Sequence, residues 1–414
     1  MKFYYSLLPI LAGLMTSGAQ AAPLSLNYIG QNILNTGTLF NNTQVGGLSG
    51  IDYDSTSNQY IVISDDRSTI NPARFYNLTL DLNQFNRSVA PGSAGVNFTD
   101  TRALLTPAGT TYAANTVDPE SIRLHNGQIY WTNEGQRAAA GLQNPTVRQA
   151  NLDGSFVRDF SVPNYYNPAG SISGLASGDS GVRNNLAFES LTFSNDGKTL
   201  YTATENALSQ DGLPATVANG TDSRILAFDA NTGNATGEFI YQTDPVIDAP
   251  VPDTNFATNG LVELLNVPGL SDSFIAVERS FSAGIPGTGN NIRLYLTSLA
   301  GATNILGQDD LDNATPFTRA SKELLLDLST LTNEDGTPLA LDNIEGVTFG
   351  PKFNGLSTLI LVSDNNFSGS QFTQFLAFQV ATVPLPSALP LFATALFGLC
   401  FQGIKRKSKL VVIS

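Results

Sequence analysis

Residues 189–206 read ESLTFSNDGKTLYTATEN and have the pattern of a β-hairpin. Two short runs rich in apolar and branched residues flank the segment NDGK at 195–198, which is typical of a tight β-hairpin turn. The stretch opens with Glu189 and closes with Glu205 and Asn206. We therefore expect two adjacent antiparallel strands that begin and end with carboxylates.

The same pattern occurs four more times along the chain. Each copy has a polar or acidic residue, then Ser or Gly, then a branched apolar residue, a strand, a turn and a second strand that ends in acids. The other copies begin with SGIDY at 49–53, ESIRL at 120–124, NGLVE at 259–263 and EGVTF at 345–349. Counted between the Ser or Gly positions 50, 121, 190, 260 and 346, the spacings are 71, 69, 70 and 86.

Near-equal spacing favours a propeller over a sandwich, because each repeat has room for two more strands after its hairpin. We predict an all-β fold, a β-propeller of five to six four-stranded blades, with any sixth blade in the longer fourth interval. Only one strand region, 371–380, follows the last hairpin. We expect the N-terminal stretch 24–34 to complete that blade, so that the N- and C-terminal strands close the ring.

Composition limits the chemistry that the chain can perform. Its 414 residues include 35 Asp and Glu against 21 Lys and Arg, and the resulting charge of −14 disfavours binding to nucleic acid. A single His and a single Cys exclude an internal disulfide and any zinc site built from several of these ligands. Catalysis would therefore rest on carboxylates, Arg, Lys, Tyr, Ser or a metal held by oxygen ligands.

The N-terminus carries an export signal. Lys2 precedes an apolar stretch at 7–15, and AQAA follows at 19–22. This order is typical of a secretory signal peptide cleaved after a small residue. We predict a signal peptide over residues 1–21, followed by the propeller domain over 22–383.

The C-terminal segment 384–414 carries a second signal. The motif VPLP begins at 383, an apolar stretch of 20 residues covers 385–404, and KRKSK follows at 405–409. We predict a C-terminal transmembrane helix with its basic end in the cytoplasm. The three parts in this order resemble the PEP-CTERM sorting signal of bacterial exported proteins. The resemblance implies an exosortase-type processing enzyme as a partner and a final location at the cell surface or in the extracellular matrix; a permanent anchor is the alternative.

Matched positions of a propeller form rings around its axis, so the acids of the five repeats should meet. The expected entry ring is Ser49, Glu120, Glu189, Asn259 and Glu345, and the expected exit cluster is Asp65, Asp66, Glu134, Glu205, Glu278 and Asp364. Crowded carboxylates repel one another and need cations, Arg partners or protons. The acids could bind Ca²⁺, which prefers oxygen ligands, or they could accept backbone N–H bonds that tie blade to blade.

Five ordered segments resemble the phytase-like domain family, named for the esterase-like activity of phytase. They are SDDR at 64–67 with PARFY at 72–76, DPESI at 118–122, AFESL at 187–191, VERSF at 277–281, and DNIEG at 342–346 with VSDNNF at 362–367. The resemblance covers about residues 46–379 and implies a propeller related to the bacterial alkaline phytases, which are Ca²⁺-dependent phosphomonoesterases. Phytate itself is disfavoured, because the exported part has only three lysines, Lys198, Lys322 and Lys352.

We therefore predict an exported, Ca²⁺-dependent hydrolase of phosphate or carboxylic esters that uses metal-activated water. The expected metal ligands are Asp65, Asp66, Glu120, Glu189, Glu205, Glu345 and Asp364. The expected catalytic residues are Arg74 and Arg279, which would hold the anion, and Glu134. The ligand would be a small anionic ester or a carbohydrate. The alternative is a non-catalytic extracellular matrix or surface propeller that binds a carbohydrate or a protein partner.

Overall fold

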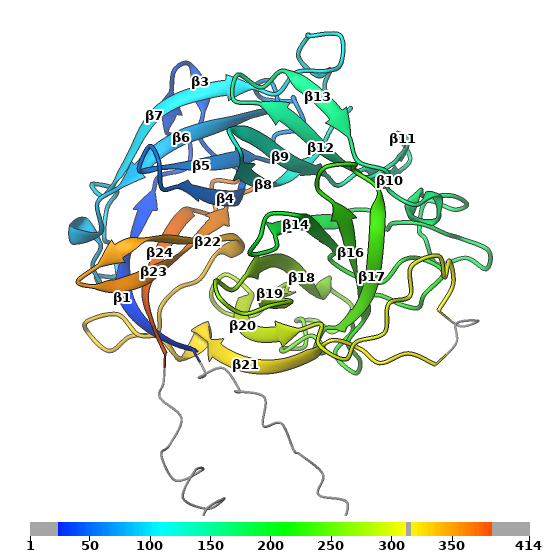
Figure 1. The fold of residues 1–414 in the computed structure, drawn as a ribbon. Coiled ribbons are helices and arrows are strands. Elements are labelled where there is room, and N and C mark those ends of the chain that lie inside the picture. The colour runs from blue at the N-terminus through cyan, green and yellow to red at the C-terminus, as the bar shows by residue number, and fades with distance from the viewer. Residues whose placement is uncertain (1–23, 312–315, 383–414) are drawn as a thin grey trace, which may run out of the picture. The chain divides into compact units, whose positions relative to one another are not determined.

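A computed structural model describes residues 24–311 and 316–382. Within them, Leu26–Ala381 form one compact unit whose regular secondary structure consists almost entirely of strands (Figure 1). No helix of the described residues is long and apolar enough to cross a membrane. The predicted signal peptide at 1–21 and the predicted transmembrane helix and sorting signal at 384–414 lie outside the described residues.

Five four-stranded antiparallel sheets surround a common axis as the blades of a propeller (Figure 1). Blade 1 contains β4 (Leu48–Asp54), β5 (Gln59–Ser64), β6 (Arg74–Leu80) and β7 (Val96–Ala103). Blade 2 contains β8 (Pro119–His125), β9 (Gln128–Asn133), β12 (Thr146–Asn151) and β13 (Phe156–Asp159). Blade 3 contains β14 (Phe188–Phe193), β15 (Thr199–Thr204), β16 (Asp222–Asp229) and β17 (Ala235–Gln242).

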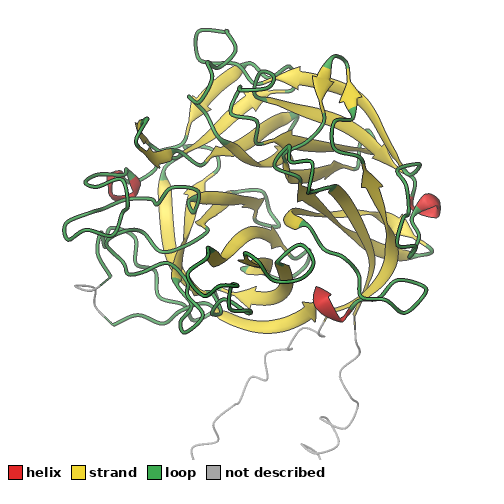
Figure 2. Cartoon of the chain, turned by 180° about the vertical axis from the view of Figure 1, so that it is seen from behind, coloured by secondary structure: helices red, strands yellow, loops and turns green. Residues whose placement is uncertain are grey.

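Blade 4 contains β18 (Ala257–Asn266), β19 (Ser273–Ser282), β20 (Asn290–Ser298) and β21 (Ser321–Asp327). Blade 5 contains β22 (Asn343–Phe353), β23 (Leu356–Asp364), β24 (Thr373–Thr382) and β1 (Leu24–Leu34). Two small hairpins, β2 (Leu39–Phe40) with β3 (Thr43–Gln44) and β10 (Gln136–Ala138) with β11 (Gly141–Gln143), lie outside the blades. Short helical turns at Leu82–Gln84, Asn164–Tyr166 and Leu328–Thr330 lie at the periphery (Figure 2).

The ring closes as the sequence predicts. β1 pairs with β24, so the N-terminal strand becomes the outer strand of the blade that the C-terminal hairpin begins. The prediction of a propeller with five to six four-stranded blades is confirmed, and the described residues form five. The long interval before β22 forms loops and the turn Leu328–Thr330, and the described part of it contains no sixth sheet.

The hydrophobic core lies between neighbouring blades. Alternate side chains of a strand point to opposite faces of its sheet, so each blade presents an apolar face to the blades on both sides. Between blades 1 and 2, for example, Phe75 and Ile61 pack in one cluster with Ile122 and Trp131. This packing fixes the inner strands, whose side chains face the axis.

The first strand of each blade is innermost, because each contacts the first strands of both neighbouring blades. A β-bulge interrupts each of these strands near its start and inserts one extra residue, which re-aims the local side chains. In blades 1, 3 and 5 the extra residues are Ser49, Glu189 and Glu345. In blade 4 the bulge lies between Leu261 and Glu263, three residues later than the repeat alignment at Gly260 predicts.

Candidate functional site

Eight carboxylates gather at one end of the propeller axis. In an antiparallel hairpin the end of the second strand lies beside the start of the first, so the acids at both positions meet at the same mouth of the channel. The acid cluster consists of Asp65, Asp118, Glu120, Glu134, Glu189, Glu205, Glu345 and Asp364. Seven of the eight side chains are buried, and Asp65 is nearly so.

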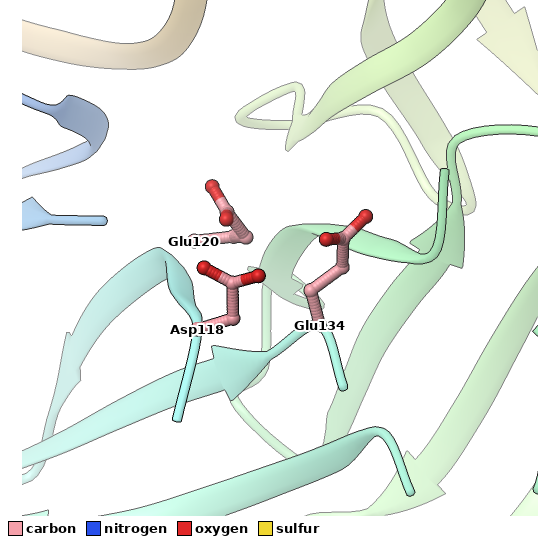
Figure 3. Close-up of side chains that lie close together, drawn as sticks. All are labelled: Asp118, Glu120 and Glu134. Atoms are coloured by element: carbon pink, nitrogen blue, oxygen red, sulfur yellow. The ribbon is translucent and has the colours of Figure 1, made fainter. Parts of the chain in front are cut away.

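The closest group within the cluster comes from blade 2. Asp118 directly precedes β8, Glu120 lies within β8, and Glu134 directly follows β9. Each offers one carboxylate oxygen, and these oxygens all lie within 4.8 Å of one another (Figure 3). An arrangement of three convergent carboxylates is suited to a divalent cation with oxygen ligands.

Two arginines, in the part of the chain that the structure describes, form ion pairs with the acid cluster. Nη2 of Arg279 lies 3.3 Å from Oε1 of Glu205, and its Nη1 lies 3.6 Å from Oε1 of Glu345. Nη1 of Arg67 lies 3.4 Å from Oδ2 of Asp118. Two positive charges cannot balance eight carboxylates, so the cluster keeps an excess of negative charge when its acids are ionised.

Burial and mutual repulsion raise the pKa values of these acids. Burial raises the pKa of Asp118 to about 7, although Arg67 opposes the shift. Burial raises the pKa of Glu345 to about 8 and that of Asp364 to about 6, with Arg279 opposing both shifts. Burial followed by the neighbouring carboxylates also raises the pKa of Glu120 well above its usual range. The folded protein therefore holds protons here that would leave the same side chains in water.

Most of the predicted site residues meet in the acid cluster. The structure brings together Asp65, Glu120, Glu134, Glu189, Glu205, Arg279, Glu345 and Asp364. Ser49, expected in the entry ring, donates through Oγ to the backbone carbonyl of Glu120 at 2.9 Å. Asn259, also expected there, donates through Nδ2 to Glu278 at 3.0 Å.

Two predicted residues, Asp66 and Arg74, pair with each other instead of joining the cluster. Nη1 of Arg74 donates to Oδ2 of Asp66 at 2.7 Å, and both side chains are buried. Asp66 also accepts the backbone N–H groups of Thr69 and Asn71, each at 2.8 Å. Arg74 donates as well to the carbonyl of Gln44 at 2.6 Å. These bonds give the pair a structural task, which is to hold the loop after β5.

Blade 4 also departs from the expected exit cluster. Glu278 pairs with Leu261 across the hairpin, as Ser64 pairs with Leu48, so Arg279 occupies the position that Asp65 has in blade 1. Adjacent residues of a strand face opposite sides. Glu278 accordingly points away from the cluster and accepts bonds from Tyr241 and Lys322, each at 2.6 Å.

Asp118 is not among the metal ligands predicted from the sequence. The available signal is its position in the segment DPESI, two residues before Glu120. It pairs through its backbone carbonyl with the N–H of Glu134 at 2.9 Å, as Gly47 does with Asp65 at 2.8 Å. In the structure the Asp118 side chain enters the cluster, where one of its oxygens lies within 4.8 Å of oxygens of Glu120 and Glu134.

A cleft of about 550 Å³ opens beside the acid cluster. Arg279 and Asn343 line the cleft and also contact the acids, because Asn343 donates to Glu345 at 2.8 Å and accepts a bond from Arg279. A molecule in this cleft would therefore contact Arg279, whose guanidinium also faces the acid cluster. The cleft and the acid cluster are therefore adjacent, and Arg279 and Asn343 belong to both.

Comparison with known proteins identifies the family. The phytase-like family, described as "esterase-like activity of phytase", matches residues 43–367. No curated protein matches the chain. Among solved structures, one titled "Structure of Dos1 propeller" is similar with a TM-score of 0.31 and 8% sequence identity, over 80% of this chain and 68% of that chain. The family match spans all five hairpins and every acid of the cluster, and the chain thus belongs to the phytase-like family, as a β-propeller of the hydrolase kind.

Proposed function

We propose that this protein is an exported, Ca²⁺-dependent hydrolase of phosphate or carboxylic esters. The observation that carries the proposal is the acid cluster, in which the described residues set eight carboxylates against two arginines. Buried charges of one sign are costly unless cations or protons compensate them. The family description, esterase-like activity of phytase, supports ester hydrolysis.

The donor set fits Ca²⁺. All the candidate ligands are oxygens, and Ca²⁺ takes about six to eight of them. Oδ1 of Asp65 and Oε2 of Glu205 are buried without a hydrogen-bond partner, which is costly unless a ligand compensates them. The residues that would hold the metal are Asp65, Asp118, Glu120, Glu189, Glu205, Glu345 and Asp364, whereas Glu134, the third acid of the close group from blade 2, would stay available to act on the water. When bound, Ca²⁺ supplies positive charge that polarises a phosphoryl or carbonyl oxygen and acidifies a bound water.

Two residues would act on the substrate. Arg279 would hold the anionic group of the ester, because its guanidinium faces both the cleft and the cluster. Glu134 would take the proton of the attacking water, because burial raises its pKa and makes it a better base near neutral pH. Glu134 already accepts the N–H of Ala187 at 2.8 Å, which orients its carboxylate. Arg74 is not assigned to this step, since it pairs with Asp66 outside the acid cluster and does not line the cleft.

Export is proposed from the sequence signals at the two ends. The signal-peptide pattern at 1–21 and the sorting pattern at 384–414 support secretion, passage through the membrane and processing by an exosortase-type enzyme. The protein would then act at the cell surface or in the extracellular matrix. Its ligand would be a small anionic ester or a carbohydrate, and its charge of −14 disfavours nucleic acid.

A non-catalytic propeller that binds a carbohydrate or protein is the second candidate. One observation favours it: Glu134 accepts the N–H of Ala187 at 2.8 Å, and Asp364 accepts that of Asn366 at 2.6 Å. These two acids therefore have a structural use that requires no catalysis. Among the described residues, no backbone N–H group donates to the side chains of the other six carboxylates. This difference favours metal binding over a purely structural role for the cluster.

The proposal is tested with the purified protein and a panel of phosphate and carboxylic esters, assayed in Ca²⁺ and in EDTA. We expect hydrolysis that EDTA abolishes and Ca²⁺ restores. Asp118→Asn should raise the Ca²⁺ concentration that hydrolysis requires. Asp159→Asn should not change it, because the Asp159 side chain is 46% exposed in a surface pair with Arg148. Calcium binding without any chelator-sensitive hydrolysis would leave the non-catalytic propeller as the function.

A further inference from the structure

The composition of the cleft beside the acid cluster points to a substrate class. Ten residues line its volume of about 550 Å³. Among the described residues that line it, Arg279 is the only charged one, and six others are neutral Asn, Gln, Ser or Thr. A single arginine matches a single anionic group, whereas a ring with many phosphates would face the neighbouring carboxylates with almost no compensating charge.

Two aromatic rings form one side of the cleft. The centroids of Phe256 and Phe281 lie 6.1 Å apart at 37° between planes. Phe281 is two residues after Arg279 on β19, so both side chains leave the strand on the same face. Phe256 is 64% exposed and is the only exposed Phe, Tyr or Trp within residues 24–311 and 316–382. An exposed aromatic face beside polar groups can pack against the C–H face of a ring.

The cleft also contains polar atoms without partners. Oδ1 of Asn290 is a buried acceptor with no hydrogen-bond partner, and Nε of Arg279 is a buried donor with none. Both residues line the cleft. A hydroxyl group of a ligand could donate to Asn290 and its phosphate could accept from Arg279 after small side-chain rotations. The cleft thus combines one site for an anion, an apolar face and amide groups for hydroxyls.

We infer that the cleft holds the alcohol part of the substrate, and that this alcohol is a sugar ring with a single phosphate. The inference rests on the proposed function and makes it specific. Arg279 holds the phosphate next to the acid cluster, Phe256 and Phe281 pack against the ring, and Asn290 binds its hydroxyls. In hydrolysis, water adds to phosphorus and the P–O bond to the ring breaks. The ring oxygen leaves with the electron pair and gains a proton from the water, while phosphate keeps the hydroxyl.

Binding is measured with analogues that cannot be hydrolysed, so that the result does not depend on catalysis. The purified protein in saturating Ca²⁺ is titrated calorimetrically with the phosphonate analogue of glucose 1-phosphate and with that of glycerol 1-phosphate. We expect the ring analogue to bind about tenfold more tightly, which corresponds to the energy of one good aromatic contact. Myo-inositol hexakisphosphate should bind more weakly than the ring analogue.

Variants locate the preference. Phe256→Ala should lose about tenfold affinity for the ring analogue and leave the glycerol analogue unchanged, while Phe256→Tyr should keep both affinities. Phe256 is exposed, so neither substitution should unfold the protein. Leu213→Ala is the matched control, since Leu213 is 68% exposed outside the lining of the cleft.

Three outcomes overturn the inference: equal affinity for the ring and linear analogues, equal weakening of both by Phe256→Ala, or no binding of either analogue. These outcomes differ from a failure of the proposed function. Ring binding without chelator-sensitive hydrolysis of any ester in the panel would refute the hydrolase and keep the cleft assignment. Calcium-dependent hydrolysis of many esters without ring preference would keep the hydrolase and refute the cleft assignment.

Discussion

Arg123 and Glu263 form a buried ion pair at the centre of the propeller, with Nη2 of Arg123 2.8 Å from Oε2 of Glu263. Arg123 also donates to the backbone carbonyls of Ile51 at 2.6 Å and Val347 at 3.2 Å, and Glu263 accepts the N–H of Leu191 at 3.1 Å. These groups belong to β8, β18, β4, β22 and β14, the five inner strands. One ion pair therefore connects all five blades.

The pair depends on the bulge in β18. Glu263 is the first paired residue after the bulge of β18. The equivalent residues are Gly50 in blade 1, Ser190 in blade 3 and Gly346 in blade 5. These small residues leave room at the axis for the Glu263 side chain and the Arg123 guanidinium. The Glu263 and Arg123 side chains are 0% and 3% exposed, so the pair is fully buried among the inner strands.

Glu263→Ala should strongly destabilise the fold. The substitution leaves the Arg123 guanidinium buried without its counter-charge, which typically costs about 3–5 kcal/mol. Urea denaturation followed by circular dichroism measures the loss. Asp196→Ala is the control, because its pair with Lys198 is exposed and should contribute no more than about 1 kcal/mol. Similar losses for both variants would contradict the central role of the pair.

Calcium should stabilise the folded protein. A ligand that binds only the native state at about 100 times its Kd adds about 2.7 kcal/mol to the free energy of unfolding. Differential scanning calorimetry in Ca²⁺ and in EDTA should show a higher Tm with the metal. Glu189→Gln, which neutralises one acid of the cluster, should reduce this difference, whereas Asp159→Asn at the surface should not. An unchanged Tm in the wild type would argue against metal binding.

Without metal, stability should fall as the pH rises from about 5 to about 8. Burial raises the pKa of Asp364 to about 6, of Asp118 to about 7 and of Glu345 to about 8, all above the value of about 4 in the unfolded chain. The native state then binds more protons than the unfolded state in this range, so rising pH favours unfolding.

The pH effect is checked by urea denaturation in EDTA at several pH values. Ca²⁺ should weaken or reverse the trend, because the metal replaces the protons that the carboxylates lose. A free energy of unfolding that rises through the same range in EDTA would contradict the burial of these acids as the cause.

Arg74→Ala and Arg279→Ala should have different effects. Arg74→Ala breaks the buried pair with Asp66 and should cost about 3–5 kcal/mol of stability with no change in Ca²⁺ affinity. Arg279→Ala removes the donor that faces the cleft and should lower kcat/KM for a phosphate ester about a hundredfold. Denaturation and steady-state kinetics separate the two. A loss of activity without a loss of stability in Arg74→Ala would place Arg74 in the site after all.

Much of the candidate site could be predicted because a repeat places equivalent residues at equivalent positions. Glu120, Glu189 and Glu345 occupy the bulge position in three blades, and Asp65 and Glu205 follow the second strand in two. The repeat could not show that Asp66 turns to Arg74, since Asp66 is the direct neighbour of the cluster acid Asp65 and the two differ only in which way their side chains point.

By itself, the sequence determined the five hairpins, the blade that joins both ends of the chain and the ring of acids, because these follow from a repeated pattern along one chain. The register of blade 4, the entry of Asp118 into the cluster and the Arg123–Glu263 pair depend on the tertiary structure. A bulge shifts which side chains face the axis, and its position depends on packing against neighbouring blades, which the order of residues does not specify.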